Sequence, residues 1–115
     1  MFVRRLVLNN FRCYQDIEAE FNNEKIYITG DNGIGKTSIL EAIYYLTIGR
    51  SFRKADNSDL IRKGQKEASI YLEYHSDKEN RDHHLSCVIG KDYKLFAFDD
   101  EKVSSLSKIL RKLLA

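Results

Sequence analysis

The sequence contains no proline, only two cysteines and no apolar run long enough for a secretory signal or a membrane span. It also contains no internal repeat and no low-complexity segment. Without a leader or an anchor, we expect a cytoplasmic protein with no membrane partner. Cys13 and Cys87 lie far apart and form no C-x-x-C pattern, so in a reducing compartment we expect idle or buried thiols and no disulfide.

A strong charge of either sign is also missing. The 19 lysines and arginines and 17 acidic residues leave a formal net charge of +2, which neither establishes nor excludes a nucleic-acid partner. A chain of 115 residues, 43% hydrophobic and 31% charged, has room for one modest core. We therefore expect one domain, or a piece of one.

The first thirty residues show the alternation that is typical of β-strands. Strands are predicted over residues 2–8, 17–21 and 26–28. The first two form a hairpin, with turn-forming residues at Asn9, Asn10 and positions 12–16. The third strand runs directly into Gly30.

That strand is followed by the sequence G-D-N-G-I-G-K-T, which matches the phosphate-loop pattern G-x-x-x-x-G-K-[ST]. In such a loop, glycines let backbone N–H groups point at phosphate oxygens, and the following helix adds its positive N-terminal end. We expect Lys36 to reach the terminal phosphates and the hydroxyl of Thr37 to bind Mg²⁺. The predicted nucleotide-binding residues are Gly30, Asp31, Asn32, Gly33, Ile34, Gly35, Lys36, Thr37 and Ser38.

Helical spacing follows the loop, and strand patterns return later. A helix is predicted over residues 38–48, with Gly49 as its C-terminal cap. An antiparallel meander is predicted from strands at 68–75, 85–89 and 93–98. Residues 105–115 place leucines and an isoleucine on one helical face and basic residues on the other, which predicts a C-terminal amphipathic helix.

Residues 50–66 form the most basic stretch of the chain. Arg50, Arg53 and Lys54 are candidates for contact with DNA phosphates, which Lys and Arg bind without regard to sequence. A solvated loop explains the same residues equally well. Three histidines, His75, His83 and His84, do not predict a metal site, because neighbours on a strand point to opposite faces and no cysteine has ligand spacing with them.

Several separate stretches resemble the RecF family of DNA repair and replication ATPases, which is related to the SMC and Rad50 proteins. The loop continues as G-I-G-K-T-S-I-L-E-A-I-Y-Y-L, and an N-N-F-R segment lies at residues 9–12. More particular to this family are G-R-S-F-R at 49–53, Leu60-Ile61 followed by Gly64, and V-S-S-L-S at 103–107. The resemblance extends over nearly the whole chain.

This resemblance implies an α/β fold, the N-terminal half of an ABC-type P-loop ATPase head, with ATP and Mg²⁺ as cofactors. It places Arg12 near the nucleotide. It also implies ATP-dependent binding of single-stranded or gapped DNA, partnership with RecR and RecO, and a homodimer whose two heads close around ATP. Its context is recombinational repair and replication.

The later parts of such a head are missing from residues 1–115. No strand of apolar residues ends in Asp-Glu, and no serine-glycine signature occurs after the loop. Since phosphoryl transfer needs a positioned water and charge stabilisation, we expect a truncated head that does not turn over ATP alone.

Three alternatives remain beside the RecF interpretation. The chain can be a non-catalytic fragment that binds nucleotide weakly or binds only protein partners. A GTPase would show an N-K-x-D motif, and none occurs. A small-molecule kinase would not predict the S-F-R and L-I-x-x-G segments.

Overall fold

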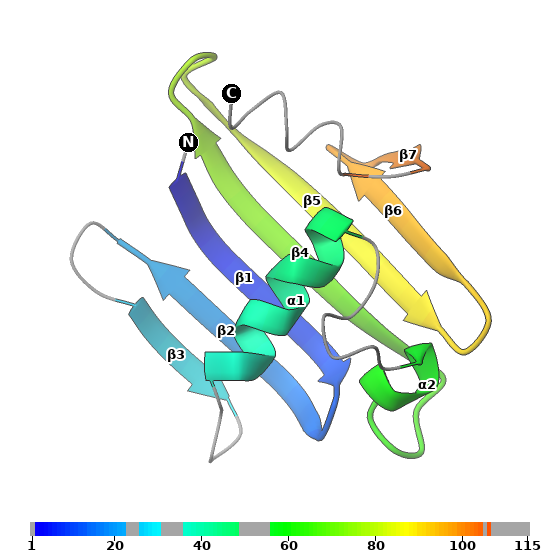
Figure 1. Cartoon of the computed structure of the whole chain (residues 1–115). Helices are drawn as coiled ribbons and strands as arrows, with labels where there is room; N and C mark the ends of the chain where they lie inside the picture. The colour runs from blue at the N-terminus through cyan, green and yellow to red at the C-terminus, as the bar shows by residue number, and fades with distance from the viewer. Residues whose placement is uncertain (1, 23–25, 31–35, 49–55, 105, 107–115) are drawn as a thin grey trace.

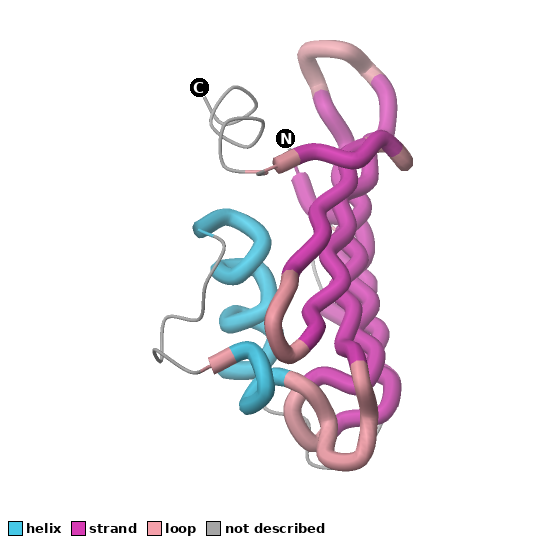
Figure 2. Tube along the Cα trace, turned by 90° about the vertical axis from the view of Figure 1, so that its right-hand side faces the viewer, coloured by secondary structure: helices cyan, strands magenta, loops and turns pink. Residues whose placement is uncertain are grey.

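The fold is built on one antiparallel sheet, with helices on one of its faces (Figures 1 and 2). The computed structural model describes residues 2–22, 26–30, 36–48, 56–104 and 106. Its strands are β1 (Phe2–Phe11), β2 (Tyr14–Phe21), β3 (Ile26–Gly30), β4 (Glu67–Ser76), β5 (Arg81–Gly90), β6 (Lys94–Phe98) and β7 (Glu101–Val103). The helices are α1 (Lys36–Ile48) and α2 (Asn57–Leu60).

The sheet joins two units that the sequence predicts separately. Its strand order is β3-β2-β1-β4-β5-β6-β7, and every pair of neighbours is antiparallel. The N-terminal hairpin and the later meander meet where β1 pairs with β4, for example at Leu6 and Leu72. This pairing makes one continuous sheet of segments more than sixty residues apart.

The N-terminal hairpin is confirmed, but its turn is shorter than predicted. Phe11 pairs with Tyr14, so only Arg12 and Cys13 form the turn, and Arg12 takes the left-handed conformation with φ of 58°. Phe11 is fully buried and also bridges to Ile61. Its burial extends β1 beyond the two asparagines that the sequence suggests as the turn.

The meander is confirmed and gains an unpredicted strand. Burial along β4 alternates residue by residue, as expected for a strand with one face on the core. After β6, Asp99 and Asp100 both adopt positive φ values, of 48° and 70°, and reverse the chain into β7. Three residues are too short for a periodic signal, so β7 is missed from sequence.

The core lies between the sheet and α1. Large buried side chains from five elements meet there, and removing each from water contributes about 1.5–3 kcal/mol. Its members include Leu6, Leu8, Ile17, Ile39, Tyr45, Leu46, Ile70, Leu85 and Ile89. The outer face of α1 remains apolar as well, since Leu40 is 62% exposed and Ile48 is 47% exposed.

The segment between α2 and β4 is held tightly against the end of β1. Asp59 accepts a hydrogen bond from the Asp56 backbone N–H at 3.2 Å, which caps α2. Next, the Arg62 N–H donates to the Asn10 carbonyl at 2.7 Å. A turn then closes from Gln65 N to Arg62 O at 2.9 Å, with Gly64 at φ of +88°, a conformation that favours glycine.

The turns at the two ends of the sheet distinguish a loop end from a hairpin end. The loop end carries the β1–β2 turn, α2 and the β5–β6 turn, and β3 leads toward it. The hairpin end carries the β4–β5 turn and the β6–β7 turn (Figure 1).

The structure describes little of the predicted C-terminal helix. Leu106 is buried, while the rest of the predicted helix at 105–115 lies outside the described residues. None of the helices in the described ranges has the length and apolar character needed to cross a bilayer.

Candidate nucleotide site and its basic surroundings

The predicted phosphate loop has a strand before it and a helix after it. β3 ends at Gly30, which pairs with Ile17 of β2, and α1 begins at Lys36. The first N–H groups of a helix have no partner within the helix and carry partial positive charge. The backbone of Lys36 and Thr37 belongs to this first turn. Residues 31–35 lie outside the described part, so their predicted phosphate contacts stay predictions.

An ion pair ties the β1–β2 turn to α1. The Arg12 guanidinium donates from Nε to Glu41 Oε1 at 2.9 Å and from Nη2 to Oε2 at 2.6 Å. The Glu41 side chain is 0% exposed and that of Arg12 is 22% exposed. The hydrogen bonds to Glu41 raise the pKa of Arg12 more than its burial lowers it.

The bidentate geometry makes this pair a structural support of the site. Two parallel N–H···O bonds fix both position and orientation. A buried carboxylate that loses its cationic partner costs about 3–5 kcal/mol, because it remains desolvated. Glu41 lies five residues after Lys36, about 7.5 Å along the helix axis. Arg12 therefore holds the second turn of the helix that starts at the loop.

Arg12 also holds the last turn of α2. Its backbone N–H donates to the Leu60 carbonyl at 2.7 Å, and Nη1 donates to the Asp59 carbonyl at 3.4 Å. One residue of the β1–β2 turn thus contacts both α1 and α2. The predicted role of Arg12 as a nucleotide contact stays a prediction, and in this structure its guanidinium is engaged by Glu41.

A second set of hydrogen bonds runs from α1 to the β5–β6 turn. Tyr45 donates from its hydroxyl to Asn57 Oδ1 at 3.1 Å, and Asn57 Nδ2 donates to the Tyr93 carbonyl at 3.3 Å. Burial raises the pKa of Tyr45 to about 12, so this hydroxyl stays protonated and can donate. These bonds connect α1, through Asn57 of α2, to the β5–β6 turn.

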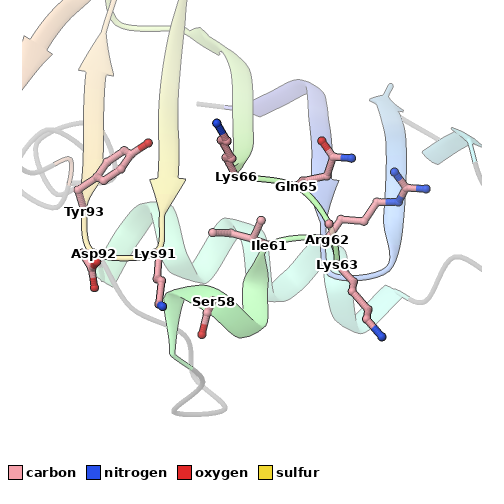
Figure 3. A pocket seen from close by; sticks show the side chains of 10 residues that line it. Ser58, Ile61, Arg62, Lys63, Gln65, Lys66, Lys91, Asp92 and Tyr93 are labelled. Atoms are coloured by element: carbon pink, nitrogen blue, oxygen red, sulfur yellow. The ribbon is translucent and has the colours of Figure 1, made fainter.

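A basic groove lies at the loop end, between α2, the turn at 62–65 and the β5–β6 turn. Figure 3 shows Ile61 in its middle, with Lys91 on one side and Arg62 and Lys63 on the other. Lys66 completes the cations that line it. The sequence identifies the 50–66 stretch as basic but gives no reason to join Lys91 to it. Only the folding of the β5–β6 turn brings them together.

The hairpin end holds a different charge cluster. The buried imidazole of His83 contacts Asp99 Oδ2 at 2.6 Å through Nδ1 and contacts Glu79 through Nε2. Burial alone would lower the pKa of His83, but its hydrogen bonds to the two carboxylates and their charges raise it overall. His84 is half-buried on the opposite face of β5, as predicted for strand neighbours.

Across the described residues, no group of three or more histidines, cysteines or acids is arranged to hold a metal ion. Cys13 is an exposed free thiol and Cys87 a buried one.

The remaining predicted site residues divide into two groups. Ser38 is buried in the first turns of α1. Arg50, Arg53 and Lys54, the predicted DNA contacts, lie outside the described residues. What sequence reasoning missed is the Arg12–Glu41 pair, whose members are 29 positions apart. Both lie in segments that carry the family resemblance, and that is the only signal that could have linked them.

Comparison with known sequences and structures agrees with this arrangement. The family described as AAA ATPase domain matches residues 1–114. A "DNA replication and repair protein RecF" of Carboxydothermus hydrogenoformans is 42% identical over 98% of this chain. The protein of the same name from Chlamydia caviae is 34% identical over 96% of it. This chain spans 31% and 29% of those two relatives.

Solved structures show the same fold. One described as "the recombination mediator protein RecF-ATPrS in RecFOR pathway" has a TM-score of 0.73 at 23% identity, covering 95% of this chain and 29% of that one. The SMC head domain from Thermotoga maritima has a TM-score of 0.61 at 16% identity, covering 97% of this chain and 41% of that one. The chain therefore belongs to the AAA ATPase domain family, and within it the sequence is RecF-like.

Proposed function

We propose that this chain binds ATP·Mg²⁺ through residues 30–38 and supplies that site to a RecF-like protein of DNA repair and replication. The observation that carries the proposal is the G-x-x-x-x-G-K-T sequence, placed between a strand that ends at Gly30 and a helix that begins at Lys36. A phosphate loop needs this strand–loop–helix context to function.

Each part of the loop has a distinct task in the proposal. Backbone N–H groups of the glycine-rich segment and the first turn of α1 surround the phosphates. Lys36 neutralises the terminal phosphates, and the Thr37 hydroxyl contributes to holding Mg²⁺. The Arg12–Glu41 pair supports this arrangement by fixing α1 against the β1–β2 turn.

The wider role follows the relatives. Their names support DNA as the macromolecular substrate, and we propose single-stranded or gapped DNA, bound in an ATP-dependent way in the cytoplasm. RecR, RecO and a second copy of the head are the proposed partners. This chain spans 31% and 29% of two of its curated relatives, and the activity that we propose for it is nucleotide binding.

Titration with a fluorescent ATP analogue tests the nucleotide site. We expect Mg²⁺-dependent binding by the unmodified chain and a 10- to 100-fold weaker affinity for Lys36→Ala, the loss that corresponds to one charge-assisted hydrogen bond of about 1.5–3 kcal/mol. Lys78→Ala, an exposed position at the hairpin end, is the matched control and should bind like the parent. Equal affinity of the parent and Lys36→Ala, or no binding by either, would contradict the proposal.

A further inference from the structure

We propose that the basic groove around Ile61 is a contact surface for the phosphate backbone of nucleic acid. Its cations are Arg62, Lys63, Lys66 and Lys91. The inference rests on the DNA-binding part of the proposed function and assigns that binding to a particular surface, separate from the ATP loop.

The first side of the groove is a turn with a fixed backbone. The Arg62 N–H is bonded to Asn10 of β1, and the turn closes at Gln65. Gly64 supplies the positive φ that this turn needs. Lys63 therefore sits at the outer corner of a rigid turn, with its side chain exposed. A preorganised backbone reduces the entropy lost when such a surface binds a partner.

The second side of the groove is the β5–β6 turn, which is held equally well. Gly90 N–H donates to the Tyr93 carbonyl at 2.9 Å, and the hydroxyl of Tyr93 is bonded to Glu67. The Tyr93 ring lies so close over Gly90 that a Cβ there would be 2.2 Å from it. This packing holds the turn in place and presents Lys91 beside the turn at 62–65.

The groove cations have no carboxylate partner in the part of the chain that the structure describes. Among the described residues, none of the four has an acidic oxygen within 4.0 Å. Asp92 is the one acid among the ten residues that line the groove. Gathering unpaired cations on one surface is unfavourable by itself, and it creates a positive potential that attracts polyanions.

The arrangement fits a series of phosphates better than a single anion. Its cations come from two separate segments, and three of the four are exposed. A second groove adjoins the first, shares Ile61, Arg62 and Lys63 with it, and extends the surface to Arg12. Because the named relatives are DNA replication and repair proteins, DNA is the polyanion that we assign to it.

A charge-neutralising pair of substitutions tests the surface. The probe is a fluorescent gapped DNA duplex, titrated with the 115-residue chain at several NaCl concentrations. The test variant is Lys63→Gln with Lys91→Gln. The control variant is Lys78→Gln with Lys102→Gln, which removes the same charge from exposed positions outside the groove. Fluorescent ATP binding by all three proteins reports on the nucleotide site.

The groove pair should bind DNA about tenfold more weakly at moderate salt. Its log–log salt slope should fall by about 2, since each lost phosphate contact removes about 0.9. The control pair should bind like the parent, and all three should bind ATP alike. Equal weakening of both pairs would overturn the surface assignment while leaving DNA binding in place. Absence of salt-sensitive DNA binding by the parent would overturn both, and the ATP titration would still decide the nucleotide site.

Discussion

At the hairpin end of the sheet, Arg4, His75 and His83 lie against carboxylates, whereas the four groove cations at the loop end have no carboxylate within 4.0 Å among the described residues. Arg4 contacts Asp82 at 2.9 Å, His75 contacts the same carboxylate at 2.8 Å, and His83 lies between Asp99 and Glu79. At the loop end, Arg12 is held as closely, by the buried Glu41 at 2.6 Å. Of the cations around Ile61, Lys63, Lys66 and Lys91 are exposed.

This difference separates charges that hold the fold from charges that are available to a ligand. Paired charges at the hairpin end stabilise two turns and offer little net potential to a polyanion. At the loop end, the buried pair fixes α1 against the β1–β2 turn, and the groove cations stay available to a ligand. The same residue types thus serve stability at one end and, in our proposal, binding at the other.

The largest expected effect comes from the buried pair. Arg12→Ala should lower the free energy of unfolding by about 3–5 kcal/mol, because Glu41 loses both guanidinium donors while it stays buried. Arg4→Ala, which breaks an exposed pair at the hairpin end, should cost at most about 1 kcal/mol. Urea unfolding followed by circular dichroism measures both. Similar losses for the two variants would remove the distinction between the ends.

Two buried tyrosines give a matched comparison of intermediate size. Tyr45→Phe removes the hydrogen bond to Asn57 and should destabilise the chain by about 1 kcal/mol. The hydroxyl of Tyr74, toward the hairpin end, is buried without a hydrogen-bond partner in the described structure. Tyr74→Phe should therefore be neutral or stabilising by a similar amount. If Tyr74→Phe proves the more damaging of the two in thermal unfolding, our account of their contacts is wrong.

The smallest effect is the pH dependence of the hairpin end. The pKa of His83 is raised in the folded chain. The stability that protonated His83 contributes is therefore complete below the unfolded pKa of 6.5, and it is lost as the pH rises through the folded pKa. Asp99, whose pKa is lowered, acts in the opposite sense and loses its contribution as pH falls below 3.8. We expect protonation of His83 to change the free energy of unfolding by about 0.2–1 kcal/mol.

Urea midpoints measured between pH 6 and pH 9 test this linkage. The parent should lose stability with rising pH, and His83→Gln should show a flatter profile. Lys102→Gln, at an exposed position of β7, is a control that keeps the imidazole and its two carboxylates and should keep the slope. A parent whose stability rises across this range would contradict the assignment to His83.

The predictable parts of the fold are those with a local signal. Alternation in β1, β2, β4 and β5 predicts strands because each has one face on the core. The phosphate loop is predictable because its glycines and lysine are contiguous. By contrast, α2 has four polar-rich residues and no period, so its capping by Asp59 is visible only in three dimensions.

What the sequence does not reveal depends on contacts between distant residues. The pairing of β1 with β4 joins the predicted hairpin to the meander. Arg12 and Glu41 meet across 29 positions, and Lys91 meets the 62–66 segment only through the β5–β6 turn. Periodicity describes which face of an element is buried, and it does not identify the partner against which that face packs.

Amide chemical-shift mapping of the 115-residue chain tests the division between the two ends most directly. Adding ATP·Mg²⁺ should shift the amides of residues 30–38, and adding DNA should shift those of residues 61–66 and 91. In both titrations the amides of Arg81, His83 and His84 should stay unchanged. Largest shifts at the hairpin end, or none at the loop end with either ligand, would contradict the account.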